Sequence, residues 1–373
     1  MKVALVCDWL TTVGGAESVL LALHEMYPEA PIYTSKYNKK GIDWFKDADV
    51  RTGWLQIFPT CMRRFISPLR QRYFSHLDLS SYDLVISVTG AEAKSVKTKS
   101  NKHHCVHLCY CHVPTQYYWA MYDDYLKNPG FGILNPLARL GLKLLVKPLR
   151  KKDYAAAEQP DQFITISNYA KEQIKKYYKR ESVIIYPPLD LKKFSSVDAK
   201  SSQNHHGHYN YITTSRQVNW KRLDLCVKAC LETGDDLTII GDGPEHRHLV
   251  KLAKDAKNIH FYSTMTQDKL KTYLASADAY LFPSMEPFGL APIEALAMGT
   301  PVIAYGKGGA LDYVHPGKNG VLFENQTVKS LVSAMRSFNP TDYSEVEIKN
   351  SAKPFDKQIF KQKIKELVRE TCK

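Results

Sequence analysis

The chain has 373 residues, 44% of them hydrophobic, which is enough apolar material for two globular cores of ordinary size. Its 51 lysines and arginines exceed its 38 aspartates and glutamates and give a net charge of +13. A surplus of this size predicts an anionic partner, either nucleotide phosphates or lipid head groups. No nucleic-acid-binding module is recognisable, so nucleic acid is not expected as a partner.

The N-terminal apolar run Val3–Cys7 is too short for a secretion signal and is followed at once by Asp8. No apolar stretch reaches the roughly 18 residues that a membrane span needs. The eight cysteines are scattered and do not resemble a disulfide framework. We therefore expect a cytoplasmic protein with reduced thiols.

Short apolar runs alternate with amphipathic stretches in the first half, which is typical of β-α units on a parallel sheet. The expected strands are Val3–Cys7, Ile32–Thr34, Leu84–Ser87, Cys105–Cys111 and Gln162–Ile166. Ser167 fits a cap of the helix that follows. Two prolines in Ile184–Asp190 predict a stiff, extended crossing that ends this half.

A polar stretch, Ser195–His208, precedes the second half and is expected to be a solvated loop. Helices are then expected around Leu223–Glu232 and Glu245–Ala256, and an apolar stripe predicts a last helix over Phe355–Val368. The expected strands are Tyr209–Thr214, Asp236–Ile240, Ile259–Tyr262, Ala279–Phe282, Val302–Tyr305 and Gly320–Phe323. The sequence thus predicts an α/β protein of two Rossmann-like lobes joined near residues 187–190.

The first candidate binding motif, Asp8–Glu17, connects the first strand to the first helix. Gly14 and Gly15 in this turn allow the backbone to approach a ligand, with the helix amides behind them. The spacing is not that of a dinucleotide fingerprint. A tight turn without a ligand is the alternative.

The segment Cys109–Thr115 brings His112 to the C-terminal end of a strand, where open sheets bind their ligands. Nearby cysteines and histidines suggest zinc, but same-side strand residues lie about 6.5–7 Å apart, too far for ligands of one tetrahedral ion. Pro114 fixes the loop and favours a functional His112. A structural histidine is the alternative.

Two strand-to-helix turns of the second half carry further candidates. Arg216 and Lys221, in Ser215–Asp224, can converge on a diphosphate, although a solvated basic turn is the alternative. Gly241 and Gly243 occupy the next turn, where the third glycine of a dinucleotide fingerprint is missing.

The segment Glu286–Gly299 is the most informative part of the chain. Pro292 fits the first turn of a short helix and Gly299 the position just past its end. The free amides at the start of that helix can hold an anion. Glu286 beside this anion site and Glu294 one turn inside can grip polyol hydroxyls on either side of a phosphate. This arrangement predicts a nucleotide-sugar site.

In this order and spacing the motifs resemble family 4 of the retaining glycosyltransferases with the GT-B architecture. Four segments are similar to the O-antigen and exopolysaccharide mannosyltransferase subgroup, whose usual donor is GDP-mannose: Cys111–Pro114, Tyr118–Trp119, Tyr122–Tyr125 and Tyr305–Leu311. The resemblance implies an acceptor-binding domain over 1–187, a donor-binding domain over 188–354, and a C-terminal helix at about 355–373 that returns to the first lobe.

The resemblance also implies roles for the candidate residues. Arg216 and Lys221 would neutralise the departing nucleoside diphosphate, Glu286 would hold the donor sugar, and His112 would contact the transferred sugar. Ribose hydroxyls would bind Glu294, and the backbone amides of Phe288, Gly289 and Leu290 would bind sugar and phosphate. The remaining donor-binding candidates are Gly14, Gly15, Gly241 and Gly243. No side-chain nucleophile, metal or other cofactor is implied.

The expected function is therefore transfer of a hexose, with mannose from GDP-mannose first, to a glycan or lipid-linked acceptor of cell-surface polysaccharide or glycolipid synthesis. A transferase that uses UDP-glucose or UDP-N-acetylglucosamine and a non-catalytic sugar-nucleotide-binding protein are the alternatives.

Arg139, Lys143 and Lys147 lie on one stripe of a leucine-rich segment, and residues 61–65 and 69–74 are also basic and aromatic. These segments predict peripheral attachment to the inner membrane face, with solvated charges on a docked helix as the alternative.

Overall fold

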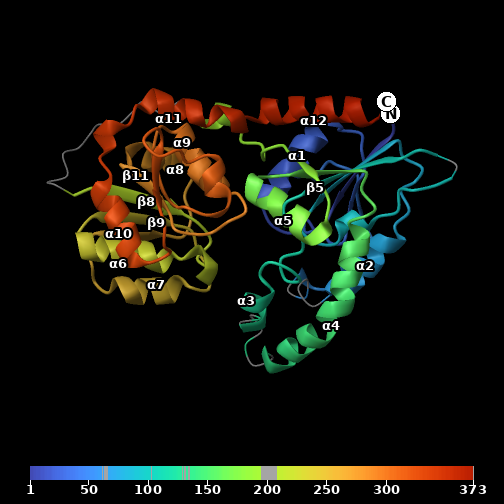
Figure 1. Cartoon of the computed structure of the whole chain (residues 1–373), viewed down its shortest axis with the longest axis horizontal. Coiled ribbons are helices and arrows are strands. Elements are labelled where there is room, and N and C mark those ends of the chain that lie inside the picture. The colour runs from blue at the N-terminus through green and yellow to red at the C-terminus, as the bar shows by residue number, and fades with distance from the viewer. Residues whose placement is uncertain are drawn as a thin grey trace. The chain divides into compact units, whose positions relative to one another are not determined.

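The structure is a computed structural model that describes residues 1–60, 62, 66–101, 103–127, 129, 132, 135–194 and 208–372. The chain forms two compact units (Figure 1). The first unit consists of Met1–Pro188 with Gln358–Lys373, and the second consists of Leu189–Lys357. Each contains a parallel β-sheet with helices packed against it, so the predicted class, α/β with two Rossmann-like lobes, is confirmed.

The first unit has a seven-stranded parallel sheet in the order β3-β2-β1-β4-β5-β6-β7. Its strands are β1 Val3–Cys7, β2 Ile32–Thr34, β3 Val50–Thr52, β4 Leu84–Thr89, β5 Val106–Cys111, β6 Gln162–Thr165 and β7 Ser182–Ile184. Its helices are α1 Gly15–Met26, α2 Ser67–His76, α3 Tyr122–Lys127, α4 Asn135–Ala156, α5 Asn168–Tyr178 and α12 Lys357–Thr371. Every residue of the central strands β1, β4 and β5 is buried, as in a sheet covered on both faces.

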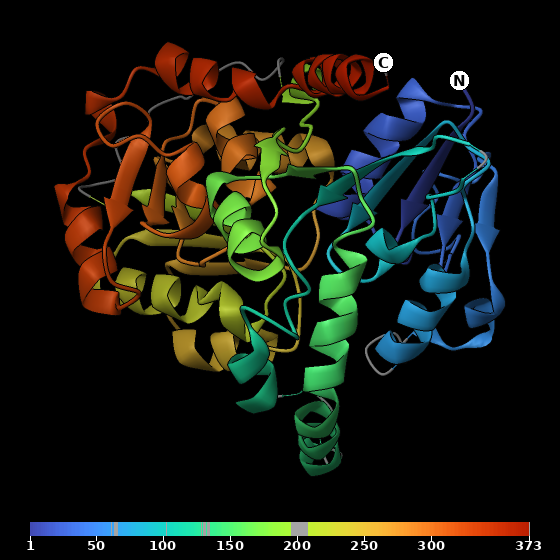
Figure 2. The same cartoon turned by 45° about the vertical axis from the view of Figure 1, so that its right-hand side comes forward.

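The C-terminal helix α12 packs on the first unit, as the fold class predicted (Figure 2). The ring of Phe360 lies 5.9 Å from that of Tyr110, and the ammonium of Lys361 lies 2.6 Å from the carboxylate of Glu25 on α1. The apolar stripe of α12 is therefore buried against the first sheet, although the second unit separates it in sequence from the other elements of the first.

The second unit has a six-stranded parallel sheet in the order β10-β9-β8-β11-β12-β13. Its strands are β8 Asn210–Thr214, β9 Asp236–Ile240, β10 Ile259–Tyr262, β11 Ala279–Phe282, β12 Val302–Tyr305 and β13 Gly320–Phe323. Its helices are α6 Leu223–Thr233, α7 His246–Ala253, α8 Gln267–Ser276, α9 Leu290–Ala297, α10 Val328–Ser337 and α11 Glu345–Ser351. All six strands were predicted from the sequence. The predicted range of β8 began one residue earlier, at Tyr209.

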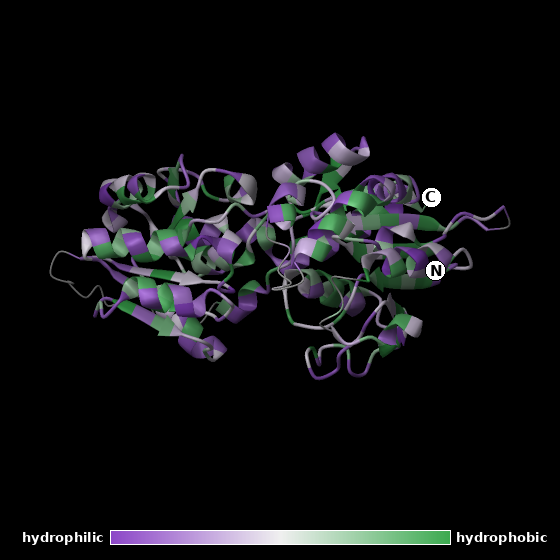
Figure 3. Cartoon of the chain, turned by 90° about the horizontal axis from the view of Figure 1, so that it is seen from below, coloured by the Kyte–Doolittle hydropathy of each residue, from purple (hydrophilic) through white to green (hydrophobic). Residues whose placement is uncertain are grey.

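Two strands of the first unit were missed, β3 and β7, and both lie at an edge of the sheet. Edge strands bury only part of their surface and carry a weak apolar signal; β3 has no fully buried residue. Figure 3 shows apolar residues running through the strands, whereas the helices alternate between hydrophilic and hydrophobic residues. Of the loop expected over 195–208, only His208 lies among the described residues. None of the described helices combines the length and the hydropathy that a membrane span requires.

Candidate active site

The second sheet has a topological switch point between its adjacent strands β8 and β11. From β8 the chain proceeds to β9 and β10 on one side, and from β11 to β12 and β13 on the other. Ligands of open parallel sheets bind beyond the carboxyl ends of the strands at such a point. The loops that follow β8 and β11 carry most of the candidate residues of this unit.

Lys221 and Glu286, from these two loops, form an ion pair. The ammonium of Lys221 contacts Glu286 Oε1, and the same oxygen accepts a hydrogen bond of 2.8 Å from the hydroxyl of Ser284. Both side chains are largely buried, at 17% and 19% exposure, so water screens their attraction only in part. The structure thus joins a cation and a carboxylate that are 65 positions apart in the sequence.

The turn that carries Glu286 is held by the loop that follows β12. The amide of Gly309 donates to the carbonyl of Glu286 at 2.8 Å, and the hydroxyl of Tyr313 donates to the carbonyl of Phe288 at 2.9 Å. Gly308 has a φ of +73°, and a Cβ there would overlap the carbonyl oxygen of Glu286. Close backbone packing at Gly308 therefore fixes the position of the glutamate.

Helix α9 begins immediately after this turn. Gly289 caps it with a φ of +98°, and a Cβ at Gly289 would lie 2.7 Å from the ring of Phe282. Leu290 is the first helical residue and Pro292 lies in the first turn. Gly299, with a φ of +81°, follows the end of the helix. The helix start and stop inferred from the prolines and glycines are confirmed.

Glu294 lies in α9 and is partly buried. Burial raises the pKa of its carboxyl to about 7, because the charged form loses solvation. No described side chain forms a hydrogen bond or an ion pair with this carboxylate. Arg216 is exposed and likewise has no such partner in the described part of the chain. The structure records no contact between either residue and the Lys221–Glu286 pair.

Gly241 and Gly243 lie beside the loop that follows β8. A Cβ at Gly241, whose φ is +130°, would overlap the carbonyl of Ser215, and a Cβ at Gly243 would overlap that of Gln217. The amide of Gln217 donates to the carbonyl of Asp242 at 2.9 Å. Packing between the two loops therefore accounts for both glycines, and their role in donor binding stays a prediction.

In the first unit, His112 directly follows β5, and its amide donates to the carbonyl of Thr89 at 2.9 Å. Its Nε2 is buried and has no hydrogen-bond partner in the described structure. Burial lowers the pKa of the imidazole to about 4, so the ring is neutral at pH 7. A neutral ring with an unsatisfied nitrogen is suited to hydrogen-bonding a polar ligand.

Gly14 and Gly15 lie where predicted, at the turn from β1 into α1. Gly14 caps the helix in an extended conformation and Gly15 is the first helical residue. A Cβ at Gly14 would lie 2.9 Å from the carboxylate of Glu17. A side chain at Gly14 would therefore crowd Glu17, so local packing alone accounts for a glycine here.

The structural role of the Asp8 carboxylate was not predicted from the sequence. Its buried carboxylate accepts hydrogen bonds from the hydroxyl of Thr89 and from the amides of Gly90 and Ala93, at 2.8–3.0 Å. Thr89 is the last residue of β4, the neighbour of β1 at the switch point of the first sheet, and Gly90 and Ala93 follow it. Asp8 thus fixes the loop after β4.

Two buried ion pairs were also missed. Arg70 of α2 pairs with Glu92 at 2.9 Å, and the hydroxyl of Tyr117 donates to the same carboxylate at 2.7 Å. Lys94 pairs with Asp153 of α4 at 2.6 Å. No periodic pattern connects residues this far apart, so only the tertiary structure reveals the pairs.

The Arg70 pair bears on the predicted basic surface of residues 69–74. The Arg70 side chain is 3% exposed and its guanidinium is 4.9 Å from the ring of Trp9, so Arg70 is not part of such a surface. Arg72 is exposed, and membrane attachment of the segment stays a prediction. The companion segment 61–65 lies outside the described residues except for Met62.

His107 lies in the core. It is fully buried in β5, its Nε2 lies 2.8 Å from the hydroxyl of Ser87, and burial lowers its pKa to about 3. Within the described ranges, no three histidine, cysteine, aspartate or glutamate side chains gather as metal ligands.

Two pockets, of about 680 and 230 Å³, are lined by residues other than the candidate site residues.

Residues 196–353 match the family model of glycosyl transferases group 1. An uncharacterized glycosyltransferase of Methanocaldococcus jannaschii is 23% identical over 244 residues, which cover 64% of this chain and 67% of that protein. A GDP-mannose-dependent alpha-(1-6)-phosphatidylinositol monomannoside mannosyltransferase of Mycobacterium tuberculosis is 33% identical over 140 residues. That match spans only 33% of this chain and 36% of the relative.

Among solved structures, the Anabaena protein HepE in complex with UDP is similar over 99% of this chain and 100% of its own, with a TM-score of 0.71 and 16% identity. At that identity the likeness establishes the fold alone. The chain therefore has the two-domain GT-B fold, and its second unit carries a domain of the glycosyl transferases group 1 type.

Proposed function

We propose that the protein is a retaining, metal-independent glycosyltransferase that moves a hexose from a nucleotide-sugar to a glycan or lipid-linked acceptor. The observation that carries this proposal is the Lys221–Glu286 ion pair between the loops at the switch point of the second sheet. The match of residues 196–353 to glycosyl transferases group 1 supports it.

In this proposal the leaving nucleoside diphosphate lies near Lys221 and Arg216. The exposed guanidinium of Arg216 has no carboxylate partner in the described structure and is available for a bidentate contact with phosphate. Lys221 would exchange part of its contact with Glu286 for the phosphate. Cations placed where negative charge develops stabilise the transition state, and they do so without a metal.

Glu286 would accept hydrogen bonds from the donor sugar, and Glu294 from the ribose. The amides of Phe288, Gly289 and Leu290 would contact sugar and phosphate at the start of α9. His112 would contact the transferred sugar. The remaining donor-binding candidates are Gly14, Gly15, Gly241 and Gly243.

The bond between the anomeric carbon and the phosphate oxygen breaks, and a new bond forms from the acceptor hydroxyl to the same carbon. The acceptor approaches from the face that the diphosphate leaves, and its proton passes to the departing phosphate oxygen. Configuration is then retained without a protein nucleophile.

We propose GDP-mannose as the donor, since a GDP-mannose-dependent enzyme is among the relatives in sequence. The UDP complex of HepE favours a UDP-sugar as the second candidate. The two candidate donors are distinguished by incubating the protein with GDP-mannose, UDP-glucose or UDP-N-acetylglucosamine and measuring the nucleoside diphosphate released. Even without acceptor, a transferase releases some nucleoside diphosphate from its own donor. Release from none of them, with or without added acceptor glycans, would reject the proposal. NMR of the sugar product tests for retention.

We further propose that the protein works as a peripheral protein at an anionic membrane surface, through α4. Leucines of its N-terminal half are exposed, among them Leu140 at 54%. Lys143 and Lys147 are exposed beside them, whereas Arg139 donates at 2.6–3.1 Å to carbonyls at the end of α3. Flotation with anionic liposomes at low salt tests this, with a charge reversal of Arg139, Lys143 and Lys147 as the comparison. Failure of wild type to float would reject it.

A further inference from the structure

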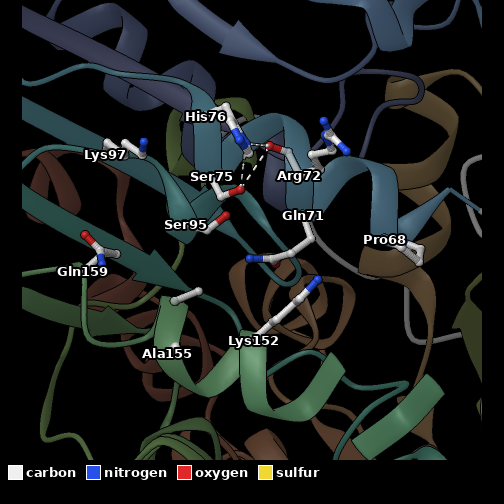
Figure 4. Close-up of a pocket in the computed structure, with 11 residues that line it drawn as sticks. Pro68, Gln71, Arg72, Ser75, His76, Ser95, Lys97, Lys152, Ala155 and Gln159 are labelled. Carbon is white, nitrogen blue, oxygen red and sulfur yellow. Dashed lines mark hydrogen bonds between the residues drawn. The ribbon is translucent and has the colours of Figure 1, made fainter. Parts of the chain in front are cut away.

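A pocket of the first unit lies between α2 and α4 and is lined by none of the candidate site residues (Figure 4). It has a volume of about 680 Å³. Helix α2 lines it with side chains spaced three and four positions apart, which lie on one helical face: Pro68, Gln71, Arg72, Ser75 and His76. Ser95 and Lys97 line it from the chain after β4, and Lys152, Ala155, Ala156 and Gln159 from the end of α4 and just beyond.

The pocket is basic. Arg72, Lys97 and Lys152 are exposed, and none of them forms an ion pair with a described carboxylate. None of its described lining residues is acidic, although Lys97 also interacts electrostatically with Asp78 outside the pocket. Three cations without a facing carboxylate favour an anionic ligand.

Gln71 adds a requirement for hydrogen-bond donors. Its side chain extends toward the space that Lys152 also enters (Figure 4). The residue is 8% exposed, and its amide oxygen is buried without a donor. Leaving such an acceptor unsatisfied costs stability. A ligand that brings a hydroxyl group as well as an anion would remove this cost.

The face of α4 that lines the pocket continues into an exposed row of leucines. Lys152 lies seven, eight and fifteen residues after Leu145, Leu144 and Leu137, which places all four on one side of the helix. These leucines are 48%, 68% and 67% exposed. An apolar strip that leads to a basic, polar pocket is complementary to an amphiphile with an anionic head.

From this geometry we propose that the α2–α4 pocket binds the head group of an anionic, hydroxyl-bearing phospholipid. The phosphate contacts Arg72 and Lys152, a head-group hydroxyl donates to Gln71, and the leucine row lies against the acyl region. The inference deepens the membrane part of the proposed function and rests on it.

The experiment measures binding of the full chain to vesicles of equal parts phosphatidylcholine and phosphatidylglycerol. Removing two phosphate contacts with Arg72→Gln and Lys152→Gln should weaken binding about thirtyfold. Lys143→Gln with Lys147→Gln is the comparison, because it removes the same charge from exposed positions of α4 outside the pocket. It should weaken vesicle binding but leave the binding of a soluble head group unchanged.

Soluble probes separate the pocket from general surface attraction. Glycerophosphoglycerol, the head group without acyl chains, should bind wild type and the Lys143/Lys147 variant alike and be lost in the Arg72/Lys152 variant. Gln71→Leu should remove the preference for phosphatidylglycerol over phosphatidic acid, which lacks the head-group hydroxyls. Inorganic phosphate should bind more weakly than glycerophosphoglycerol.

Three results would overturn the inference: equal vesicle binding by wild type and the Arg72/Lys152 variant, no binding of wild type to the anionic vesicles, or inorganic phosphate binding as tightly as the head group. Release of nucleoside diphosphate, measured on the same samples, keeps the outcomes distinct. A protein that releases it but ignores the vesicles contradicts the lipid site alone. One that binds the vesicles but releases none with any donor or acceptor contradicts the transferase proposal alone.

Discussion

Lys221 and Glu286 form an ion pair that joins the loop after β8 to the loop after β11. In the proposed reaction Lys221 faces the leaving diphosphate and Glu286 the sugar, so their contact aligns the two halves of the donor. The pair also satisfies each charge before the donor binds, which limits the cost of holding both in a partly buried site.

Replacing Lys221 with alanine should therefore reduce kcat by a factor of about thirty to a thousand, or about 2–4 kcal/mol of transition-state stabilisation. Steady-state kinetics with the preferred donor provide the measurement. Lys271→Ala is the matched control, since Lys271 forms an ion pair with Asp268 within α8. A Lys221 variant with unchanged kcat would remove this residue from the leaving-group site.

Glu286→Ala should lower turnover far more than affinity for the nucleoside diphosphate, because the glutamate is expected to contact the sugar and not the nucleotide. Turnover and calorimetric binding of the diphosphate are compared in wild type and variant. In the double variant with Lys221→Ala the two losses should not add, since residues in contact are coupled. Unchanged turnover would reject the placement of Glu286 at the reaction centre.

The pattern of the sequence was sufficient for the two sheets but not for the side-chain networks. Apolar runs identify buried strands such as β9 and β12 because both faces of a parallel strand are covered. Likewise, the Pro292 and Gly299 signals located α9, since backbone geometry is encoded locally. The Lys94–Asp153 pair connects residues 59 positions apart and leaves no local pattern.

For the candidate site too, the sequence identified residues but not their contacts. Residue types at strand ends identified Lys221 and Glu286 as candidates, and only the tertiary structure pairs them. Gly241 and Gly243 are donor-binding candidates through the family resemblance, and the structure adds that each has a close backbone neighbour. A glycine signals close approach, but the sequence does not say of what.

Gly308→Ala should disturb the Glu286 turn, because the new Cβ would overlap the carbonyl of Glu286. Gly317→Ala is a matched control: its φ of +78° is close to the +73° of Gly308, but a Cβ there meets nothing within 4 Å. Both changes should cost about 1 kcal/mol of unfolding free energy through backbone strain, and Gly308→Ala should cost more because the carbonyl of Glu286 must move. Only Gly308→Ala should also reduce kcat, and equal kcat in the two variants would contradict the supporting role of this loop.

Asp153→Ala should destabilise the first unit by about 3–5 kcal/mol, because it leaves the buried charge of Lys94 without its partner. It also removes the acceptor for the Trp119 indole and the Tyr178 hydroxyl, at 2.7 and 2.8 Å. Urea unfolding followed by tryptophan fluorescence measures the loss. Glu181→Ala breaks the exposed pair with Lys175 and should leave stability almost unchanged, because water screens the pair. A loss of similar size in both variants would contradict the argument from burial.

Glu294 should make the second unit less stable as the pH rises. Its carboxyl has a pKa of about 7 in the folded protein against an ordinary value of 4.5, so between these values the folded state binds more protons than the unfolded state. Stability that is present below about pH 4.5 is then lost as the pH rises through about 7, by up to about 3 kcal/mol. Thermal unfolding of wild type and Glu294→Gln at about pH 5.5 and about pH 8 measures this. The glutamine does not titrate, so the variant should gain stability relative to wild type at the higher pH. A difference between the two proteins that does not change with pH would show that this carboxyl is already ionised in the folded state at the lower pH.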